Sequence, residues 1–143
     1  MSMPLSKGGA GVLLDRLSEE HKDLLPCAER MAELASANSS ELWSAVEEYA
    51  AKLAAPLEHH IAEEDDVLFP AYARETGDET MVGQFRDEHR EILKLRDELM
   101  AVHRLRKDLP RLGSIAARLA DLLHSHMTRE DMALFPSARQ TLG

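Results

Sequence analysis

Two stretches of this sequence combine a histidine with a glutamate four residues later. They read HIAEEDDVLFP at residues 60–70 and HMTREDMALFP at residues 126–136, so the pairs are His60 with Glu64 and His126 with Glu130. Residues four apart on an α-helix lie on one face about one turn from each other, so a ring nitrogen and a carboxylate oxygen can reach the same metal ion. Each stretch is therefore a candidate half of a metal site.

A second pair of histidines lies outside these stretches. Glu20-His21 recurs as Glu88-His89, so each half of the chain carries the same three polar groups. The second half looks like a copy of the first, related by an approximate twofold axis. Such symmetry allots two histidines to each of two metal ions, with one glutamate from each half as a bridge. The predicted metal ligands are His21, His60, Glu64, His89, His126 and Glu130.

Burial of these six side chains would need compensation. They lie on apolar helix faces, where each unsatisfied polar group costs about 1–3 kcal/mol, against a typical total stability of about 5–15 kcal/mol. A single core histidine is more often a hydrogen-bonded residue than a ligand, and mutual hydrogen bonds could satisfy part of the set. An excess of ring nitrogens over carboxylates, repeated in both halves, favours metal ions instead.

The ligand types leave iron, manganese and zinc open as the metal. Two ferrous ions carry more positive charge than two glutamates neutralise, so we expect an anionic bridge such as hydroxide, oxide or peroxide. Both ions would keep open positions for a small exogenous ligand. No arrangement of Ser, Cys and His nucleophiles suggests ordinary hydrolysis.

Four predicted helices must position these residues. Apolar residues recur at spacings of three and four over about 12–36, 41–75 and 79–104, and again from Pro110 onward. Short connections make sequential helices antiparallel, so we predict an all-α, up-down-up-down four-helix bundle made of two helical hairpins. The predicted inner face of the last helix is Leu112, Ile115, Leu119, Leu122, His126, Glu130 and Ala133.

Local signals mark where these helices begin and end. Ser39 or Ser40 can cap the second helix, and Gly77-Asp78 indicates a tight reversal before the third. Prolines 26, 56 and 70 fall inside predicted helices, and each predicts either a kink or a break between shorter helices. A kink at Pro56, one turn before His60, would help to aim that ligand.

Length and composition set limits on domain organisation and partners. A chain of 143 residues is expected to form one domain, with residues 1–11 as a flexible leader and 12–143 as the bundle. The net charge of −9 argues against nucleic acid or an anionic membrane as a partner, and charges interrupt every apolar run before it could span a membrane. Cys27 is the only cysteine and no signal peptide is evident, so we expect a cytoplasmic protein.

The order of these motifs resembles the hemerythrin-like domain family over about residues 12–140. A single histidine, HxxxE closing in Leu-Phe-Pro, Glu-His, and a second HxxxE closing in Leu-Phe-Pro carry the resemblance. It implies a four-helix bundle that holds a non-haem di-iron centre with an oxo or hydroxo bridge. The six residues named above would be its ligands.

The sequence also departs from the oxygen-carrying members of that family. They have a further histidine one turn from the ligand of the third helix and a final HxxxxD, whereas here Phe85 and Leu93 stand one turn either side of His89. Asp131 does stand five residues after His126. The missing histidine argues against simple oxygen storage, and the pattern is closer to hemerythrin-like proteins of redox, peroxide or nitric oxide chemistry.

Several polar residues near the predicted ligands are given other roles. His59 and His124 are expected to face outward or to contact ligands from outside, and His103 is expected to be exposed. Glu63, Asp65 and Asp66 are assigned to a solvated acidic face, although Glu63 would replace Glu64 if the helix were rotated. Whether Asp131 contributes is left open, and Cys27 is expected to point away from the ligands.

Three functions follow from this pattern. The leading hypothesis is a di-iron protein that binds, senses or reduces a small oxidant such as dioxygen, peroxide or nitric oxide. The alternative is an iron- or redox-responsive sensor or binding module without turnover, which would act through a partner protein or a homodimer. A metal-free interaction bundle is the third interpretation.

Overall fold

The computed structural model describes residues 9–143, and these residues form helices joined by short connections. No strand occurs within this part of the chain, so the predicted all-α class is confirmed. The elements are α1 (Gly9–Ser36), α2 (Glu41–Leu53), α3 (Ala55–Glu63), the π-helical turn η1 (Glu64–Leu68), α4 (Phe69–Thr76), α5 (Glu79–Leu105), α6 (Leu109–Arg129), the second π-helical turn η2 (Glu130–Leu134) and α7 (Phe135–Leu142).

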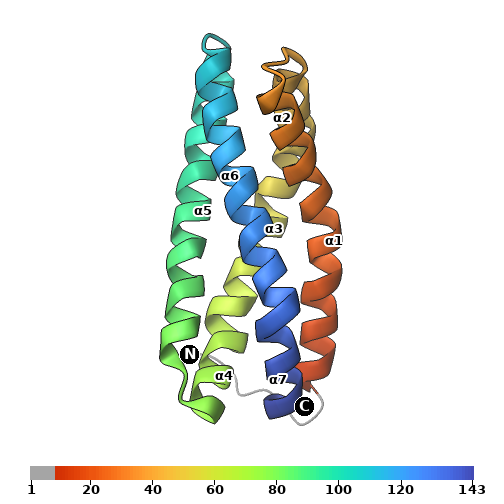
Figure 1. Ribbon diagram of the computed structural model, residues 1–143, viewed down its shortest axis with the longest axis vertical. Coiled ribbons are helices and arrows are strands. Elements are labelled where there is room, and N and C mark those ends of the chain that lie inside the picture. Colours follow the sequence, from red (N-terminus) through yellow and green to blue (C-terminus); the bar gives the residue numbers. More distant parts are fainter. Residues whose placement is uncertain (1–8) are drawn as a thin grey trace.

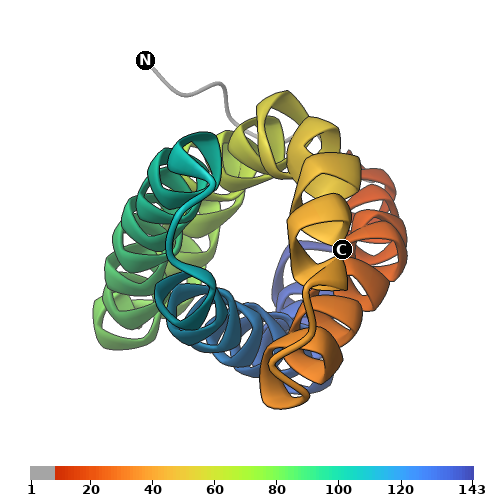
Figure 2. The same ribbon diagram turned by 90° about the horizontal axis from the view of Figure 1, so that it is seen from above.

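The helices pack side by side as a bundle. Helix α1 packs against α2 and α6, and α5 packs against α6 and α2. The shorter helices α4 and α7 contact each other at one end. Figure 1 shows the long axis of this arrangement, and Figure 2 shows the helices grouped around it. None of the described helices contains a stretch long and apolar enough to cross a membrane.

The first helix begins earlier than the sequence predicted. Of the leader predicted at residues 1–11, residues 1–8 lie outside the described residues, and Gly9–Gly11 already belong to α1. Ala10 is fully buried, because it lies on the same apolar face as Leu13, Leu14 and Leu17.

Side-chain caps and one glycine end or start the helices where the sequence indicated. Gly77 has a φ of +72° and closes α4 in the left-handed conformation. Asp78 then accepts a hydrogen bond from the backbone N–H of Met81 at 3.0 Å, which starts α5. Before α2, the hydroxyl of Ser39 accepts from the N–H of Glu41 at 3.1 Å, whereas Ser40 makes no side-chain cap.

The single helix predicted over 41–75 is divided into shorter ones. Ala54 leaves the helical conformation, and Pro56 lies in the first turn of α3, so a break precedes His60 in place of a smooth kink. A proline is tolerated in the first turn because the backbone N–H that it lacks has no helical partner there. Pro26, by contrast, stays inside the continuous helix α1.

Two π-helical turns begin at the predicted bridging glutamates. The backbone N–H of Phe69 donates to the carbonyl of Glu64, and that of Phe135 donates to the carbonyl of Glu130. Pro70 and Pro136 follow directly, and each lacks the N–H that an α-helix would use at that point. The wider turn adds one residue to the helical register, so both the Leu and the Phe of each Leu-Phe-Pro are buried.

The same shift corrects part of the predicted inner face. Ala133 is exposed, because the π turn rotates it away and brings in Leu134. Leu122 is only half buried at the edge of the core, and its neighbour Leu123 is buried in its place. The other apolar residues predicted for that face, Leu112, Ile115 and Leu119, are buried.

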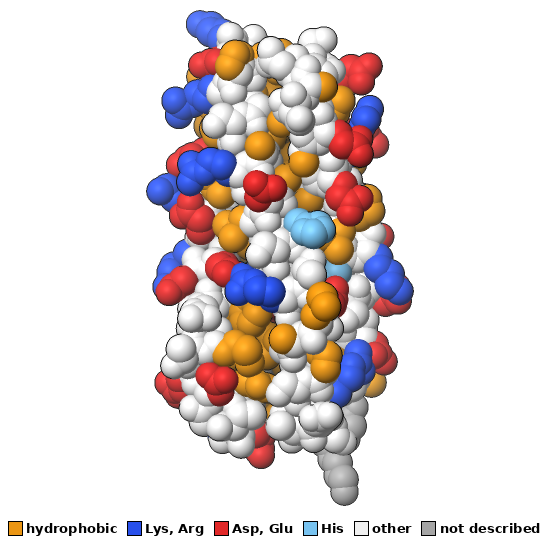
Figure 3. All heavy atoms as spheres, viewed as in Figure 1, with side chains coloured by type: hydrophobic (Ala, Val, Ile, Leu, Met, Phe, Trp, Pro, Cys, Tyr) orange, Lys and Arg blue, Asp and Glu red, His pale blue; other side chains and the backbone are white. Residues whose placement is uncertain are grey.

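A layer of polar side chains separates two apolar clusters. The larger cluster contains residues such as Met31, Val46, Leu99 and Leu119, and the smaller contains Leu14, Leu68, Phe69, Phe85 and Phe135. In α1 and α5 the predicted histidine falls between residues of the two clusters, and in the other two segments the histidine and glutamate lie where the chain passes from the larger cluster to the smaller. On the surface shown in Figure 3, acidic and basic side chains are interspersed.

Candidate metal centre

The six residues predicted as metal ligands meet in one buried cluster. His21 comes from α1, His60 from α3 and His89 from α5. His126 comes from α6, and the two glutamates are the first residues of η1 and η2. None of the six is more than 3% exposed. Their proximity is a finding, whereas their role as ligands stays a prediction.

The first group that could hold a metal ion, called here the first metal group, consists of His21, His60, Glu64 and Glu130. The two Nε2 atoms of His21 and His60 lie 3.2 Å apart. His21 Nε2 lies 3.2 Å from Glu130 Oε1, and His60 Nε2 lies 3.5 Å from Glu64 Oε1. Each residue thus offers one donor atom to a common point, and all the donor atoms lie within 4.8 Å of one another.

The second metal group consists of Glu64, His89, His126 and Glu130. The Nε2 atoms of His89 and His126 lie 3.0 Å apart. His89 Nε2 lies 3.0 Å from Glu64 Oε1, and His126 Nε2 lies 3.4 Å from Glu130 Oε1. The two groups share both glutamates, which is the arrangement that two bridging carboxylates would give.

A carboxylate holds the outer nitrogen of every imidazole in the cluster. Within each half, His60 Nδ1 lies 2.7 Å from Glu20 Oε1, and His126 Nδ1 lies 2.7 Å from Glu88 Oε1. These two glutamates belong to the repeated Glu-His pairs, so the sequence contained the signal for them, although their role was not predicted. They fix the ring orientation of histidines on a different helix.

The other two imidazoles are held by aspartates of the opposite half. His21 Nδ1 lies 3.0 Å from Asp131 Oδ2, and His89 Nδ1 lies 2.8 Å from Asp65 Oδ1. Asp131 therefore contacts a predicted ligand from outside the cluster. The assignment of Asp65 to a solvated acidic face was wrong, because the π turn that begins at Glu64 directs the next side chain toward α5.

The atoms that face one another at the centre of the cluster are ring nitrogens and carboxylate oxygens, and no other residue that the structure describes places a positive charge between them. A carboxylate at Nδ1 places the proton of a neutral imidazole there, so the Nε2 lone pairs of facing rings would point at each other. Glu64 Oε2 and both carboxylate oxygens of Glu130 are buried and have no hydrogen-bond partner. Cations between the rings would satisfy all of these atoms at once, so the residues fit a pair of metal ions.

When no metal is bound, protons on the histidines supply the positive charge that the carboxylates attract. Burial lowers the pKa of His89, but its hydrogen bonds to Asp65 and Glu64 outweigh burial and raise the pKa to about 9. Burial also lowers the pKa of His126, and the charge of Glu130 with the surrounding hydrogen bonds raises it to about 11. The carboxylates thus draw a positive charge into this cluster in either state.

Phenylalanines cover the imidazoles from the smaller apolar cluster. Phe135 stacks on His21 with ring centroids 5.5 Å apart, and Phe69 stacks on His89 at the same distance. Both belong to the repeated Leu-Phe-Pro, so that motif does more than disturb the helix. Phe85 adds an edge contact to His126 at 5.1 Å. These rings keep water away from one side of the centre.

The remaining polar residues singled out by the sequence lie outside the cluster. His59 and His124 are exposed, as predicted, and His59 pairs with Glu63 at 3.1 Å. Glu63 also pairs with Arg16, which leaves Glu64 as the inward residue. Cys27 is buried away from the six residues, and its S–H donates to the carbonyl of Asp23.

The prediction for His103 was wrong. This residue is half buried, and its Nε2 lies 2.9 Å from the carbonyl oxygen of Trp43. The contact joins α5 to α2 at the end of the bundle away from α4 and α7. A polar residue near the end of an amphipathic helix can be drawn in by a single neighbouring aromatic residue, and the sequence pattern gives no sign of that neighbour.

Comparison with known proteins supports one family. The family model for the hemerythrin HHE cation binding domain matches residues 12–139. Searches of curated proteins and of solved structures gave no match. The matched region includes all six residues of the buried cluster and the four carboxylates that hold their imidazoles. The chain therefore belongs to the family of hemerythrin HHE cation-binding domains.

Proposed function

We propose that this protein is a non-haem di-iron protein that binds or reduces a small oxidant such as dioxygen, peroxide or nitric oxide. The observation that carries the proposal is the sharing of Glu64 and Glu130 by two histidine pairs. A single-metal site would need neither the second pair nor carboxylates whose oxygens are buried without hydrogen bonds. Two ions that share two carboxylates are the common arrangement for chemistry on small oxygen species.

The protein contributes binding and surroundings to such a centre. His21, His60, His89 and His126 would hold the ions through Nε2, and the glutamates would bridge them. When bound, two iron ions supply electrons and open positions for a small ligand. The stacked Phe69 and Phe135 restrict the ligand to a small size and exclude bulk water.

We also propose that the bundle has the antiparallel up-down-up-down topology predicted from the sequence. In support, the connections between α1 and α2, between α4 and α5, and between α5 and α6 span few residues. The chain in Figure 1 reverses its direction at each of them. In this topology α2, α3, η1 and α4 together form one segment, and α6, η2 and α7 form another.

Metal content and spectrum test the central claim. Protein purified in air should contain about two iron ions per chain and absorb in the near ultraviolet through oxo-to-iron charge transfer. Reaction with peroxide or nitric oxide would then be followed by stopped-flow absorption. A well-folded protein that contains no metal and takes up none from added ferrous iron would refute the proposal. Binding without turnover would instead support the alternative, a sensor or binding module that acts through a partner protein or a homodimer.

A further inference from the structure

The two metal groups have the same ligands but different charges behind them. We call the space between His21 and His60 the first position and the space between His89 and His126 the second position. Because the halves of the chain are copies, residues can be matched by their distance from the ligands. Ser18 and Arg86 each stand three residues before a matched histidine, and Glu63 and Arg129 each stand one residue before a bridging glutamate.

Arginines accompany both carboxylates behind the second position. Arg129 pairs directly with Glu88, which holds His126. Arg86 Nε lies 4.0 Å from Asp65 Oδ1, and the same guanidinium donates to the backbone carbonyl of Asp65 at 2.9 Å. Each arginine therefore draws on the negative charge of a carboxylate that accepts a hydrogen bond from an imidazole.

The carboxylates behind the first position have no such arginine among the described residues. The hydroxyl of Ser18 donates to Asp131 Oδ1 at 3.1 Å. Arg16 lies on the same side of the bundle, and it pairs with Glu63 and not with Glu20. Lys22 is 72% exposed and pairs with Glu19, so solvent screens its charge.

The difference amounts to two unit charges. Behind the second position, Asp65 and Glu88 are balanced by Arg86 and Arg129. Behind the first position, Arg16 balances Glu63, and Glu20 and Asp131 remain as two negative charges. The carboxylates are partly buried close to the imidazoles, whereas the side chains of Arg86 and Arg129 are 39% and 43% exposed, so solvent weakens the difference without removing it.

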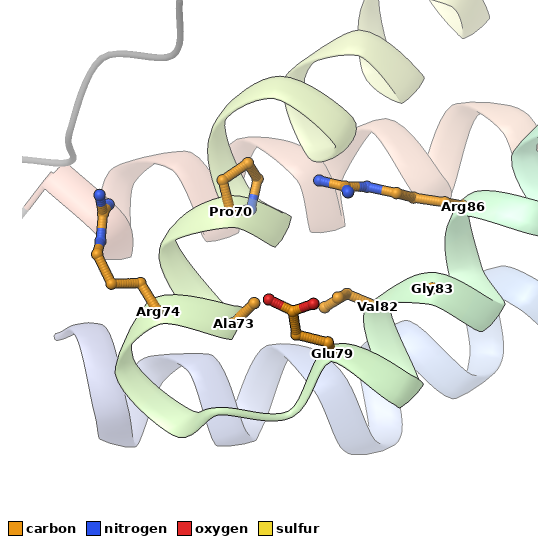
Figure 4. Close-up of a pocket in the computed structure, with 7 residues that line it drawn as sticks. All are labelled: Pro70, Ala73, Arg74, Glu79, Val82, Gly83 and Arg86. Atoms are coloured by element: carbon orange, nitrogen blue, oxygen red, sulfur yellow. The ribbon is translucent and has the colours of Figure 1, made fainter.

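The exchange of Ser18 for Arg86 between the halves also changes the pocket beside each position. A pocket of about 340 Å³ reaches His21, and Ser18, Asp131, Lys22 and Arg139 contribute to its wall. In the second half, the longer side chain of Arg86 occupies the matching place, and its guanidinium lies 5.9 Å from the centre of the Phe69 ring. Figure 4 shows Arg86 at the rim of a separate pocket, extended toward Pro70. An arginine thus stands beside the carboxylate behind the second position, whereas the matching residue behind the first is a serine, and Lys22 and Arg139 each pair with another carboxylate.

We propose that the first position binds a divalent cation more tightly than the second and fills first, and that Arg86 and Arg129 weaken the second position. A carboxylate on Nδ1 raises the basicity of the imidazole toward a metal, and an arginine on that carboxylate reduces the effect. The proposal rests on the proposed function, since it requires that both groups bind metal. Arg86 and Arg129 act through other residues and are positioning residues.

Calorimetric titration of the metal-free protein with Co²⁺ tests the order of binding. Two binding events are expected, and their assignment comes from single replacements. His60→Ala should abolish the tighter event, and His126→Ala should abolish the weaker one. Two events of equal affinity, or loss of the tighter event in His126→Ala, would overturn the proposal. Absence of any Co²⁺ binding by the wild type would refute the proposed function itself.

Removal of the two extra positive charges tests the cause. Arg86→Ser combined with Arg129→Gln leaves two uncompensated negative charges behind the second position, as behind the first, and should tighten its Co²⁺ binding by about 10–100-fold. Arg129→Lys keeps the charge and should leave the affinity near the wild-type value. Arg104→Gln combined with Arg111→Gln removes the same amount of charge about 20 Å away, at the far ends of α5 and α6, and should have little effect. Equal effects of the control and the double variant would overturn the proposal.

A variant in the opposite direction guards against misfolding of the double variant. Glu63→Arg introduces beside the first position the residue that the second position has, at a partly exposed site. It should weaken the tighter event and leave the weaker one unchanged. Circular dichroism would check that every variant remains helical, and a weakened second event in Glu63→Arg would contradict the assignment.

Discussion

The grooves beside α7 and α4 occupy matching places in the two halves, yet different side chains fill them. Arg139 of α7 stands three residues after Pro136, and it pairs with Asp15 of α1 at 2.7 Å. At the matching places the second groove has only Ala73 and Gly83, which help to line a pocket of about 500 Å³ (Figure 4). Side chains six or more residues from the predicted ligands thus differ between the halves, whereas the predicted ligands and the carboxylates on their Nδ1 atoms are the same.

Under the proposed function, this contrast indicates which positions metal binding would fix. A side chain that touches an imidazole must present a particular atom at a particular distance, so few residue types can serve there. A side chain in the outer groove has only to fill space or pair with a neighbour, and several solutions are acceptable. The differences between the halves therefore mark the residues that tune the centre and leave its construction unchanged.

Removal of a bridging glutamate should have the largest effect and should affect both halves equally. Glu64→Ala or Glu130→Ala takes away a ligand that the two metal groups share, so each variant should lose at least one metal equivalent. Metal analysis after reconstitution with ferrous iron would measure the loss. Glu63→Ala is the matched control, since its side chain points to Arg16. Full metal content in Glu130→Ala would exclude the bridging role.

Neutralisation of the carboxylates on Nδ1 should separate the halves. Glu20→Gln should lower the affinity of the first position by about 10–100-fold, because that carboxylate acts on His60 with its full charge. Glu88→Gln should lower the affinity of the second position by less, since Arg129 already draws on the charge of Glu88. Co²⁺ titration gives both values. A larger effect of Glu88→Gln would mean that Arg129 serves to hold Glu88 in place.

The pH dependence of metal binding should be strong at the second position. Since the pKa of His89 is raised to about 9, its ring carries a proton at neutral pH in the metal-free protein, and an incoming cation must displace it. Affinity should therefore increase steeply from neutral pH to about 9, and more gradually above it, because His126, with a pKa raised to about 11, still keeps its proton there. Titrations in buffers of different ionisation enthalpy would count the released protons. No proton release at pH 7 would contradict the protonated state.

The same protonation should change the stability of the metal-free protein in the opposite direction. A histidine whose pKa rises from 6.5 in the unfolded chain to about 9 stabilises the fold below about 6.5, and that contribution disappears as the pH passes about 9. Urea unfolding of the metal-free protein should thus show a lower free energy of unfolding at pH 9 than at pH 7. The metal-loaded protein should not show this decrease.

The smallest expected effect concerns a contact that breaks the twofold relation. The hydroxyls of Tyr72 and Ser137 lie 2.9 Å apart and join α4 to α7, whereas the matching residues Ala138 and Ala71 cannot make a hydrogen bond. Tyr72→Phe should reduce the free energy of unfolding by about 1 kcal/mol. Ser137→Ala should cost a similar amount, and the double variant should cost less than the sum of the two. Strict additivity in urea unfolding would show that the bond contributes nothing.

Much of the helical pattern and all six clustered residues could be read from the sequence. Helical periodicity placed His21 and His89 on apolar faces, and the His-x-x-x-Glu spacing placed the other four residues on one side of their helices. The repeat then brought the two sets together. These are short-range signals, and they determine which face of a helix turns inward.

The parts that the sequence left undetermined depend on contacts between helices or on small changes in helical register. The π turns move Ala133 outward and Asp65 toward α5, and a regular period of 3.6 residues cannot anticipate them. Glu20 and Glu88 act on histidines of other helices, so their spacing from those histidines in the sequence carries no information. The pairing of Arg129 with Glu88 also joins two helices, so the sequence spacing does not indicate it.

The π turns also make the length of the chain between ligand and phenylalanine part of the site. An ordinary α-helix over the same residues, Glu64 to Phe69, would rotate α4 by about 100° relative to α3, because only the wider π turn accommodates the extra residue. Phe69 would then leave the ring of His89 and face another side of the bundle. The count of residues in this short turn, as well as their identity, therefore decides which side chain covers the imidazole.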